Sequence, residues 1–406
     1  MVARIAIVGA GQAGARAAQA MRAARYDGRI TLIGEERHDP YERPSLSKAF
    51  LTGGQDAVES TILPPGYYAE NAIELRTATR VVGIDLCASR LECDSGPDIG
   101  FDKLLIATGS RPRMLDVPGA HLPNVFYLRS LNDAQRLRQG LAGCARIAVI
   151  GGGFLGLEVA ASARALGLEV VVLEREAHLL ARVAPRAIGQ LVADLHKSRG
   201  VDIRCGTAVR HIDGNLQATG VTLRSGEVVP ADAVFVAIGG VPNSELGALV
   251  GLGTANGIRV NHFGETEAPN VYAAGDVTNH PNRWAEQYVR LESWQVAQNQ
   301  SVTAARAMCG ERHEYHEVPW FWSDQFDVNI QMAGLPGEDD EVFYRGQCGY
   351  SKLSAFYYRD KRLTGAIAFN NGIDVRIAQQ LINQGGAVDP SRVVDPQVKL
   401  KSLLTK

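Results

Sequence analysis

Two short glycine-rich segments have the residue spacing that binds the pyrophosphate of a dinucleotide. The first, Gly9-Ala-Gly-Gln-Ala-Gly14, directly follows an apolar run and opens an alanine-rich stretch. In a GxGxxG turn the glycines allow a tight bend, close approach of the backbone to phosphate, and close packing of helix on strand. The following helix N-terminus adds N–H groups and the positive end of its dipole. Gly9, Gly11 and Gly14 are therefore candidate phosphate-binding residues, and Glu35, about 20 residues further on, is the candidate acceptor for a ribose hydroxyl.

The same pattern occurs a second time, at Gly151-Gly-Gly-Phe-Leu-Gly156. Glu174 takes the place that Glu35 has in the first unit, and a carboxylate there accepts from a ribose 2′-hydroxyl and repels a 2′-phosphate. This predicts a preference for NADH over NADPH. The adjacent Arg175 could instead bind a 2′-phosphate, so the preference depends on Glu174. Two such units in one chain imply two dinucleotides.

The elements around both turns are those of parallel βαβ units. The apolar runs that we predict as strands are residues 4–8, 29–33, 101–110, 146–150, 169–173 and 233–240. Helices follow the two turns and end near Ala24 and Leu166. The strands at 101–110 and 233–240 end in small residues, which makes Thr108, Gly109 and Gly239 candidates for close contact with a ligand. The sequence therefore predicts an α/β protein with an internal duplication.

Three further polar residues lie where ligands bind in doubly wound sheets. The proline-containing loop at 38–48 brings Arg43 and Lys48 near the carboxyl end of the first strand. They are either ligand-binding cations or two solvated charges of a surface loop, and the sequence leaves both interpretations open. Asp276 ends a buried strand and would suit a hydroxyl-rich ligand such as a ribityl chain.

Composition excludes several classes of function. A net charge of −2 and a pI near 6.5 argue against a general nucleic-acid binder. We expect no membrane association and a cytoplasmic location, because no apolar stretch reaches transmembrane length and no basic segment precedes the first strand. The six cysteines form no CxxC or CxxxxC pair, so neither a zinc site nor a local redox disulfide is expected: Cys87, Cys93, Cys144, Cys205, Cys309 and Cys348.

The character of the chain changes at about Pro319. Antiparallel strands are expected at 328–342, 352–358 and 362–369, with a last helix at about 373–383 and a polar tail. This pattern predicts a third, α+β domain. The aromatic run from Trp320 to Trp322 belongs either to its core, which is the commoner case, or to a cofactor contact.

Together the motifs resemble the glutathione-reductase-like two-dinucleotide flavoproteins. Within them, the chain is most similar to NADH-dependent ferredoxin reductases of bacterial oxygenases, of the putidaredoxin reductase and biphenyl dioxygenase reductase component type. The matching segments are Gly9–Gly14 with Glu35, Arg43–Lys48, Ala107–Ser110, Gly151–Gly156 with Glu158, Ala273–Asp276 and Pro319–Gln325. The segments Arg43–Lys48 and Pro319–Gln325 mark this branch of the superfamily.

The resemblance implies the fold, the cofactors and the site residues. It implies an FAD-binding domain at 1–112 and 243–318, an NADH-binding domain at 113–242, and a C-terminal α+β domain at 319–406. The implied FAD-binding residues are Gly9, Gly11, Ala13, Gly14, Glu35, Arg43, Lys48, Val81, Thr108, Gly109, Arg129, Asp276, Trp294 and Trp320. The implied NADH-binding residues are Gly151, Gly153, Leu155, Gly156, Glu158, Glu174 and Gly239. No metal is implied.

By the same resemblance, the protein takes two electrons from NADH onto FAD and passes them singly to a [2Fe-2S] ferredoxin. Lys48 and Glu158 are the residues expected to act at the reacting groups, by charge and position. Two alternatives stay open: an NADH-sensing flavoprotein resembling apoptosis-inducing factor, and an NADH oxidase or peroxidase. The second is disfavoured, because the loop at 40–50 has Ser45 and Ser47 where thiol-dependent relatives have cysteine.

The sequence predicts less about partners. Ferredoxin docking is expected at the edge of the FAD and C-terminal domains, where cations would attract an acidic partner. The candidate cations are Arg283, Arg290, Lys399 and Lys401. For any one of them by itself, a solvated surface charge is the commoner case. The identity of the ferredoxin and the oligomeric state, monomer or weak dimer, are left open.

Overall fold

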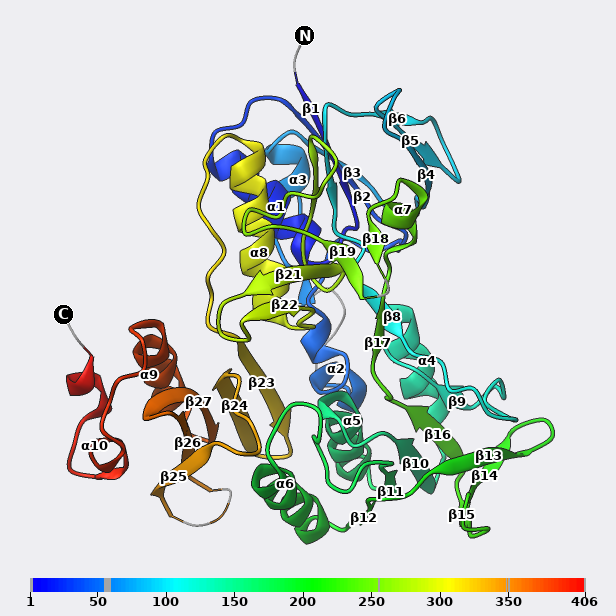
Figure 1. Cartoon of the computed structure of the whole chain (residues 1–406). Coiled ribbons are helices and arrows are strands. Elements are labelled where there is room, and N and C mark those ends of the chain that lie inside the picture. Colours follow the sequence, from blue (N-terminus) through cyan, green and yellow to red (C-terminus); the bar gives the residue numbers. More distant parts are fainter. Residues whose placement is uncertain (1–2, 55–59, 255, 348, 350, 405–406) are drawn as a thin grey trace. The chain divides into compact units, whose positions relative to one another are not determined.

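The computed structural model describes residues 3–54, 60–254, 256–347, 349 and 351–404. Its chain forms two compact units, which Figure 1 colours along the sequence. Unit 1 is drawn from residues 1–42, 57–111 and 241–319, and unit 2 from residues 43–56, 112–240 and 320–406. One glycine-rich turn therefore lies in each unit.

Unit 1 is built on a five-stranded parallel sheet with the strand order β20-β7-β1-β2-β3. Its strands are β1 (Arg4–Val8), β2 (Arg29–Ile33), β3 (Ile73–Arg76), β7 (Lys103–Ile106) and β20 (Val271–Ala273). The predicted bounds of β1 and β2 are confirmed to the residue. Because β1 has β7 on one side and β2 on the other, its carboxyl end is a topological switch point, where such sheets bind ligands.

Two helices of unit 1, α1 (Gln12–Ala23) and α8 (Trp294–Met308), pack against each other. Their contact is made largely by fully buried alanines, whose small side chains let the helix backbones come close: Ala15, Ala17, Ala18, Ala304 and Ala305. Shorter helices are α3 (Tyr67–Glu70) and α7 (Glu245–Leu249). Helix α8 begins at Trp294 and is capped by the Ser293 hydroxyl.

Smaller sheets complete unit 1. One consists of β4 (Val81–Asp85), β5 (Arg90–Cys93) and β6 (Ile99–Gly100). The other consists of β18 (Gly253–Thr254), β19 (Gly257–Arg259), β21 (Thr278–Asn282) and β22 (Gln287–Val289). The strands β8 (Ser110–Pro112) and β17 (Gly240–Pro242) lie where the chain passes from one unit to the other.

Unit 2 repeats the parallel architecture with the strand order β12-β11-β10-β16-β9. The strands are β9 (Val125–Phe126), β10 (Arg146–Ile150), β11 (Glu169–Leu173), β12 (Val201–Arg204) and β16 (Ala233–Val236). The helices are α2 (Ala49–Thr52), α4 (Leu131–Leu141), α5 (Phe154–Ala165) and α6 (Arg186–Ser198), with a 3₁₀ turn at Arg43–Ser45. A three-stranded sheet adds β13 (Val209–Gly214), β14 (Ala218–Leu223) and β15 (Val228–Pro230). The helix after the second turn, α5, begins at Phe154 with Gly153 as its N-cap.

The rest of unit 2 is an antiparallel sheet with the order β23-β24-β27-β26-β25. Its strands are β23 (Trp320–Gln325), β24 (Val328–Gly334), β25 (Glu341–Gly346), β26 (Leu353–Arg359) and β27 (Arg362–Phe369). It is followed by α9 (Gly372–Asn383), α10 (Pro390–Val394) and a 3₁₀ turn at Leu400–Leu403.

The single strand predicted at 328–342 is wrong. The structure has two strands there, β24 and β25, and they are not neighbours in the sheet. Gly334 ends β24 with φ +78°, and Pro336 follows with no N–H to donate to a ladder, so the chain turns away. The short helix α10 in the polar tail was not predicted.

In the described part of the chain, no helix is both long and apolar enough to cross a membrane.

Candidate functional site

The turn between β1 and α1 has no room for a side chain at either end. Gly9 has φ +113°, and a Cβ atom there would lie 2.2 Å from the carbonyl oxygen of Ala107. A Cβ atom at Gly14 would lie 1.9 Å from the carbonyl oxygen of Gly9. Gly11 is the N-cap of α1 and makes no side-chain cap, which leaves the first turn of the helix open to an anion. The geometry fits a pyrophosphate cradle.

Other predicted residues of unit 1 lie at the carboxyl ends of neighbouring strands. Glu35 follows β2, and its carboxylate is 71% exposed, with Oε1 3.9 Å from Nε of Arg80. After β7, the Thr108 hydroxyl donates to the Asn243 carbonyl at 2.7 Å, and the Asn243 amide donates to the Thr108 carbonyl at 2.9 Å. This reciprocal pair holds the residue before Gly109, whose φ is +67°.

The acidic candidate of unit 1 follows β20. Asp276 is buried, and its Oδ2 accepts a hydrogen bond from the Ser110 hydroxyl at 3.1 Å. Gly275, which precedes it, has φ +83°, and a Cβ atom there would lie 3.1 Å from Cβ of Ala13. The packing therefore ties the carboxylate segment to the first turn of α1. A carboxylate in this position can accept from ligand hydroxyls.

The predicted FAD-binding residues divide between the two units. Those of unit 1 are Gly9, Gly11, Ala13, Gly14, Glu35, Val81, Thr108, Gly109, Asp276 and Trp294. Val81 is the buried first residue of β4, and Trp294 is the first residue of α8. The remaining four, Arg43, Lys48, Arg129 and Trp320, belong to unit 2.

The second turn, between β10 and α5, has the same construction. Gly151 has φ +110°, and a Cβ atom there would lie 2.3 Å from the carbonyl oxygen of Ala237. A Cβ atom at Gly156 would lie 2.1 Å from the carbonyl oxygen of Gly151. Gly153, the N-cap of α5, faces open space, since nothing lies within 4 Å of a Cβ built there. Leu155 lies in the first turn of this helix, and Gly239, with φ +105°, follows the neighbouring strand β16. This turn also fits a pyrophosphate.

The acid after β11 is held by backbone donors. Glu174 Oε2 accepts from the Gly152 N–H at 2.6 Å, and Oε1 accepts from the Glu176 N–H at 2.7 Å. The neighbouring Arg175 has an 80% exposed side chain and pairs with Glu176 at 2.8 Å. The carboxylate of Glu174 is thus fixed beside the glycine turn, whereas the guanidinium of Arg175 is engaged by another acid.

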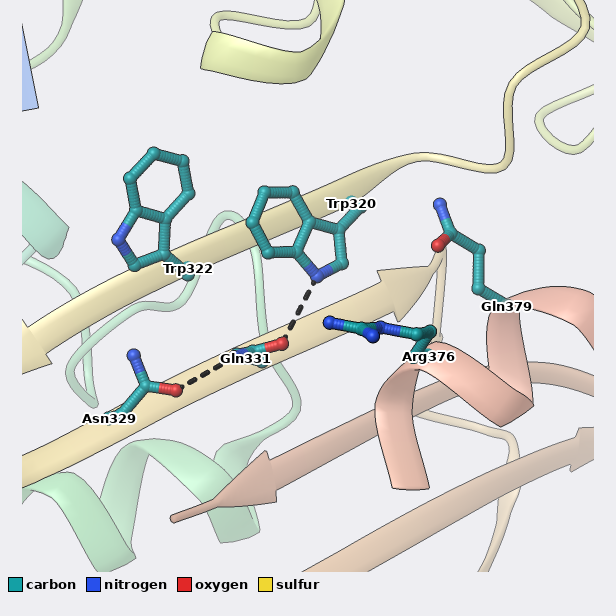
Figure 2. A pocket seen from close by; sticks show the side chains of 6 residues that line it. All are labelled: Trp320, Trp322, Asn329, Gln331, Arg376 and Gln379. Atoms are coloured by element: carbon teal, nitrogen blue, oxygen red, sulfur yellow. Dashed lines mark hydrogen bonds between the residues drawn. The ribbon is translucent and has the colours of Figure 1, made fainter. Parts of the chain in front are cut away.

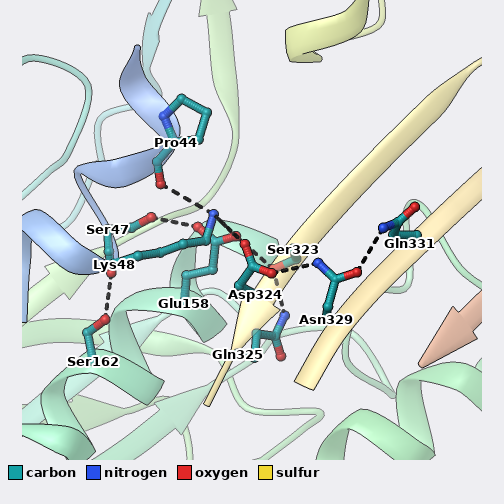
Figure 3. A network of polar contacts seen from close by, with 10 residues as sticks. All are labelled: Pro44, Ser47, Lys48, Glu158, Ser162, Ser323, Asp324, Gln325, Asn329 and Gln331. Carbon is teal, nitrogen blue, oxygen red and sulfur yellow. Dashed lines mark hydrogen bonds and ion pairs between the residues drawn. The ribbon is translucent and has the colours of Figure 1, made fainter. Parts of the chain in front are cut away.

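The two residues expected to act at the reacting groups form an ion pair in unit 2 (Figure 3). Lys48 Nζ lies 3.0 Å from Glu158 Oε1 and 3.8 Å from Asp324 Oδ2, and it donates to the Pro44 carbonyl at 3.3 Å. Glu158 projects from α5 and is only 7% exposed. A buried carboxylate needs a counter-charge or hydrogen bonds, and this one has both.

Two serine hydroxyls also donate hydrogen bonds to the Glu158 carboxylate. Ser47 Oγ donates to Oε2 at 2.6 Å, and Ser323 Oγ donates to Oε1 at 2.7 Å. Sequence reasoning assigned no role to either serine, although both lie in segments that matched the family, Arg43–Lys48 and Pro319–Gln325. The contacts join residues 111 and 165 positions apart in sequence, so spacing alone could not have indicated them.

The network continues from Glu158 into the interior. Gln325 Nε2 donates to Ser323 Oγ at 3.1 Å, and the Gln325 carbonyl oxygen lies 2.9 Å from Nε2 of His196 on α6. His196 is fully buried, and burial lowers its pKa from 6.5 to about 4. The imidazole is therefore neutral at physiological pH and donates to Gln325.

A second branch leads from Asp324 to a pocket of about 390 Å³ lined by Trp320, Trp322, Asn329, Gln331, Arg376 and Gln379 (Figure 2). Asn329 donates to Asp324 Oδ1 at 2.6 Å, and Gln331 donates to Asn329 at 2.9 Å. The indole N–H of Trp320 reaches Gln331 at 3.4 Å, and the two indoles stack with centroids 5.1 Å apart. Trp320 and Trp322 are thus half-buried at a pocket, whereas Phe321 between them stacks on Phe154 with centroids 4.5 Å apart.

Arg43 and Arg129 also meet in unit 2. The Arg43 guanidinium donates to the backbone carbonyl of Arg129 at 2.6 Å. Arg129 directly precedes a capping box in which Ser130 and Asp133 cap α4. The structure therefore brings together two residues that the family resemblance had implied separately.

No disulfide forms among the cysteines that the structure describes, and Cys348 lies outside the described residues. The segment at 40–50, where the resemblance places the cysteines of thiol-dependent relatives, has Ser45 and Ser47 instead, and Ser47 donates a hydrogen bond to Glu158.

Residues 3–301 match the pyridine nucleotide-disulphide oxidoreductase family, and residues 320–404 match the reductase C-terminal family. The chain belongs to the pyridine nucleotide-disulphide oxidoreductase family. This oxidoreductase is 41% identical to the ferredoxin–NAD(+) reductase component of an anthranilate 1,2-dioxygenase system from Burkholderia cepacia, with 98% of each chain covered.

Two solved structures are also similar to this oxidoreductase. The ferredoxin reductase for the CYP199A2 system from Rhodopseudomonas palustris is 38% identical, with a TM-score of 0.96, 99% of this chain covered and 100% of that chain. A covalent putidaredoxin reductase–putidaredoxin complex is 34% identical to this chain, with a TM-score of 0.95, 99% of this chain covered and 98% of that chain. The expected resemblance to ferredoxin reductases of oxygenase systems and the expected fold class are both confirmed.

Proposed function

We propose that this protein is an FAD-dependent NADH:ferredoxin oxidoreductase that supplies electrons, one at a time, to a [2Fe-2S] ferredoxin serving a haem-thiolate monooxygenase or a ring-hydroxylating dioxygenase. One observation carries the proposal: each of two parallel sheets bears a pyrophosphate-type turn, in a chain with full-length ferredoxin reductase relatives. Bound FAD supplies the conversion of a two-electron donation into single-electron transfers.

FAD is assigned to the turn of unit 1. Gly9 and Gly14 shape the cradle, and the N-terminus of α1 faces the phosphates. Glu35 and Asp276 are carboxylates that accept from the ribose and ribityl hydroxyls, respectively. The other assigned contacts are Gly11, Ala13, Arg43, Lys48, Val81, Thr108, Gly109, Arg129, Trp294 and Trp320. Each of these residue roles is part of the proposal.

NADH is assigned to the turn of unit 2, with Gly151, Gly153, Leu155, Gly156 and Gly239 around its phosphates. Glu174 selects NADH over NADPH, because its carboxylate is fixed next to the turn by two backbone N–H groups. Arg175 does not reverse this choice, since its guanidinium is paired with Glu176.

Lys48 and Glu158 act together: Lys48 provides a positive charge, and Glu158 holds it in place and compensates it. Glu158 holds the Lys48 ammonium at 3.0 Å, and two serine hydroxyls hold Glu158 in turn. The pair thus presents one fixed cation with its counter-charge buried behind it. A lysine in this setting tunes the electrostatic potential at the cofactor by its charge.

The NADH oxidase or peroxidase alternative receives no support from the segment at 40–50, which has no cysteine and whose Ser47 is hydrogen-bonded to Glu158. We further propose the domain division 1–112 with 243–318 for FAD, 113–242 for NADH and 319–406 for the C-terminal domain. A cytoplasmic location, where the NADH pool lies, is also part of the proposal.

The decisive experiment is NADH-driven reduction of a panel of purified [2Fe-2S] ferredoxins, with the loss of their visible absorbance as the measured signal. Ferricyanide serves as the control acceptor, because it needs no docking surface. We expect turnover with at least one ferredoxin from an oxygenase system. Rapid ferricyanide reduction without reduction of any ferredoxin, together with a long-lived charge-transfer band, would favour the NADH-sensing alternative.

A further inference from the structure

Two histidines and a glutamate converge in unit 1, away from both glycine turns in sequence. His262, Glu314 and His316 each offer a ligand atom, and these atoms all lie within 4.8 Å of one another. Glu314 Oε2 is 2.8 Å from His316 Nε2, and the rings of His262 and His316 have centroids 5.5 Å apart. Neither nucleotide assignment uses any of the three.

Local backbone structure explains why they meet. Residues 311–319 connect α8 to β23 without helix or strand. The N–H of Tyr315 donates to the carbonyl of His262 at 2.8 Å, which fastens this connection to the loop after β19. The Tyr315 ring is buried and meets the His280 ring edge-on at 5.7 Å. Because side chains alternate along an extended chain, Glu314 and His316 both project to the side opposite Tyr315.

The donor set has the chemistry of a transition-metal site. Two imidazole nitrogens and one carboxylate oxygen are a ligand set common for Zn²⁺, with a fourth position left for water. Nδ1 of His262 is buried and has no hydrogen-bond partner in the described structure, so this ring has an unsatisfied polar atom beside the other two ligands. Buried polar atoms are normally satisfied, and an ion is one way of satisfying them.

The arginine of the same connection, Arg312, is already paired with an acid. Arg312 pairs with Glu265, at 2.6 Å and 3.1 Å, and its guanidinium lies over the Phe263 ring at 4.1 Å. A cation at the cluster therefore faces the carboxylate of Glu314 with the charge of Arg312 neutralised by another acid.

We propose that His262, Glu314 and His316 form a binding site for a divalent transition-metal ion, with Zn²⁺ as the best match. The bound ion fastens the connection at 311–319 to the loop after β19, in addition to the backbone hydrogen bond from Tyr315. The site is independent of the proposed reductase function, because none of its three residues is assigned to either nucleotide.

The test is a Zn²⁺ titration of the FAD-loaded protein after removal of metals with EDTA, in competition with a chromophoric chelator. We expect about one Zn²⁺ per chain. His316→Ala and Glu314→Gln should each weaken binding by at least about 10-fold, the loss that even outer partners of metal ligands cause. Both side chains are exposed, so neither substitution should impair folding. His313→Ala is the matched control, because this histidine is exposed in the same segment but lies outside the cluster.

A second readout identifies the ligands directly. Cu²⁺ bound in place of Zn²⁺ should give an electron paramagnetic resonance spectrum with splitting from two imidazole nitrogens, reduced to one in His316→Ala. Zn²⁺ should raise the melting temperature of the wild type and of His313→Ala but not of His316→Ala. The proposal is overturned if the protein does not bind Zn²⁺ stoichiometrically. It is also overturned if Zn²⁺ binds the double variant His316→Ala, Glu314→Gln as tightly as the wild type, because the ion then binds elsewhere, for example at the cysteines.

Discussion

Lys48 Nζ and Glu158 Oε1 lie 3.0 Å apart, and the carboxylate is 7% exposed and accepts hydrogen bonds from two serine hydroxyls, Ser323 at Oε1 and Ser47 at Oε2. The pair joins the loop before α2 to helix α5 and, through Ser323, to strand β23 (Figure 3). Three segments that are distant in sequence therefore converge on one ion pair. This relationship makes the charge at Lys48 dependent on groups that do not touch it.

The first prediction concerns the sign of that charge. Lys48→Met should lower the midpoint potential of bound FAD, because it leaves the negative Glu158 without its cation. Glu158→Gln should raise the potential, because it leaves Lys48 positive. The two changes should be measured by dye-coupled redox titration. Shifts of the same sign in both variants would show that the pair acts by packing and not by charge. Ser323→Ala, which keeps both charges, is the control and should move the potential less.

The second prediction concerns the first glycine turn. Gly11 has φ −93°, which any residue can adopt, so Gly11→Leu should keep the fold while its side chain blocks the N-terminus of α1. We expect folded protein with little FAD, measured by circular dichroism and by the ratio of absorbance at 450 and 280 nm. Gly14→Leu should instead destabilise the protein, because even its Cβ atom would lie 1.9 Å from the Gly9 carbonyl. A fully flavinylated Gly11→Leu variant would contradict the assignment of FAD to this turn.

The third prediction concerns nucleotide choice. The wild type should prefer NADH, and Glu174→Gln should raise the ratio of kcat/KM for NADPH over NADH by about 10-fold or more, since it removes the charge that repels a 2′-phosphate. Glu176→Gln should raise the ratio less, by releasing Arg175 while Glu174 stays in place. Equal kcat/KM for both nucleotides in the wild type would show that Glu174 does not select NADH over NADPH.

The fourth prediction concerns acid stability. Burial lowers the pKa of His280 from 6.5 to about 4, with His262 adding a smaller contribution. Between these values the unfolded chain takes up a proton that the folded protein does not, so the free energy of unfolding falls as pH falls. The loss from this residue reaches roughly 3 kcal/mol near pH 4.

His280→Phe should remove this pH dependence without loss of stability at pH 7.5. Neither ring nitrogen of His280 has a hydrogen-bond partner in the described structure, and phenylalanine keeps the edge-on contact with Tyr315. Urea unfolding in EDTA at pH 7.5 and pH 5 measures the difference. His196→Phe is the comparison: it should also flatten the pH dependence but lower stability at pH 7.5, because it removes the hydrogen bond to Gln325. If the free energy of unfolding of His280→Phe falls between pH 7.5 and pH 5 as much as that of the wild type, His280 is not the source of the acid sensitivity.

The fifth prediction concerns ferredoxin docking. Among the candidate cations, Arg290 is only 15% exposed and pairs with Glu292, whereas Lys399 and Lys401 are exposed. Changing both lysines to Gln should lower ferredoxin kcat/KM several-fold at low salt and weaken its salt dependence, with ferricyanide reduction unchanged. Arg290→Gln alone should have little effect. Lys361→Gln, in the turn between β26 and β27, is the control. Unchanged ferredoxin kinetics in the double variant would place docking elsewhere.

The sequence by itself determined the parallel sheets and their glycine turns. Strands β1, β2, β10 and β11 have the predicted bounds, because each is a short run rich in branched apolar residues, as buried parallel strands are. Glu35 and Glu174 follow β2 and β11 as the pattern predicts, and their roles as ribose acceptors stay predictions. Prediction failed at 328–342, where the apolar pattern continues across Gly334 and Pro336 but the chain reverses.

Only the tertiary structure decided which side chains meet. The carboxylate of Glu158 accepts hydrogen bonds from residues of the loop before α2 and of β23. His262 lies beside Glu314 and His316, which are about 50 residues further along the chain. These contacts depend on how separate elements pack, which no local pattern encodes. Local pattern fixes backbone conformation, since it depends on neighbours in sequence, whereas ion pairs and ligand sets depend on neighbours in space.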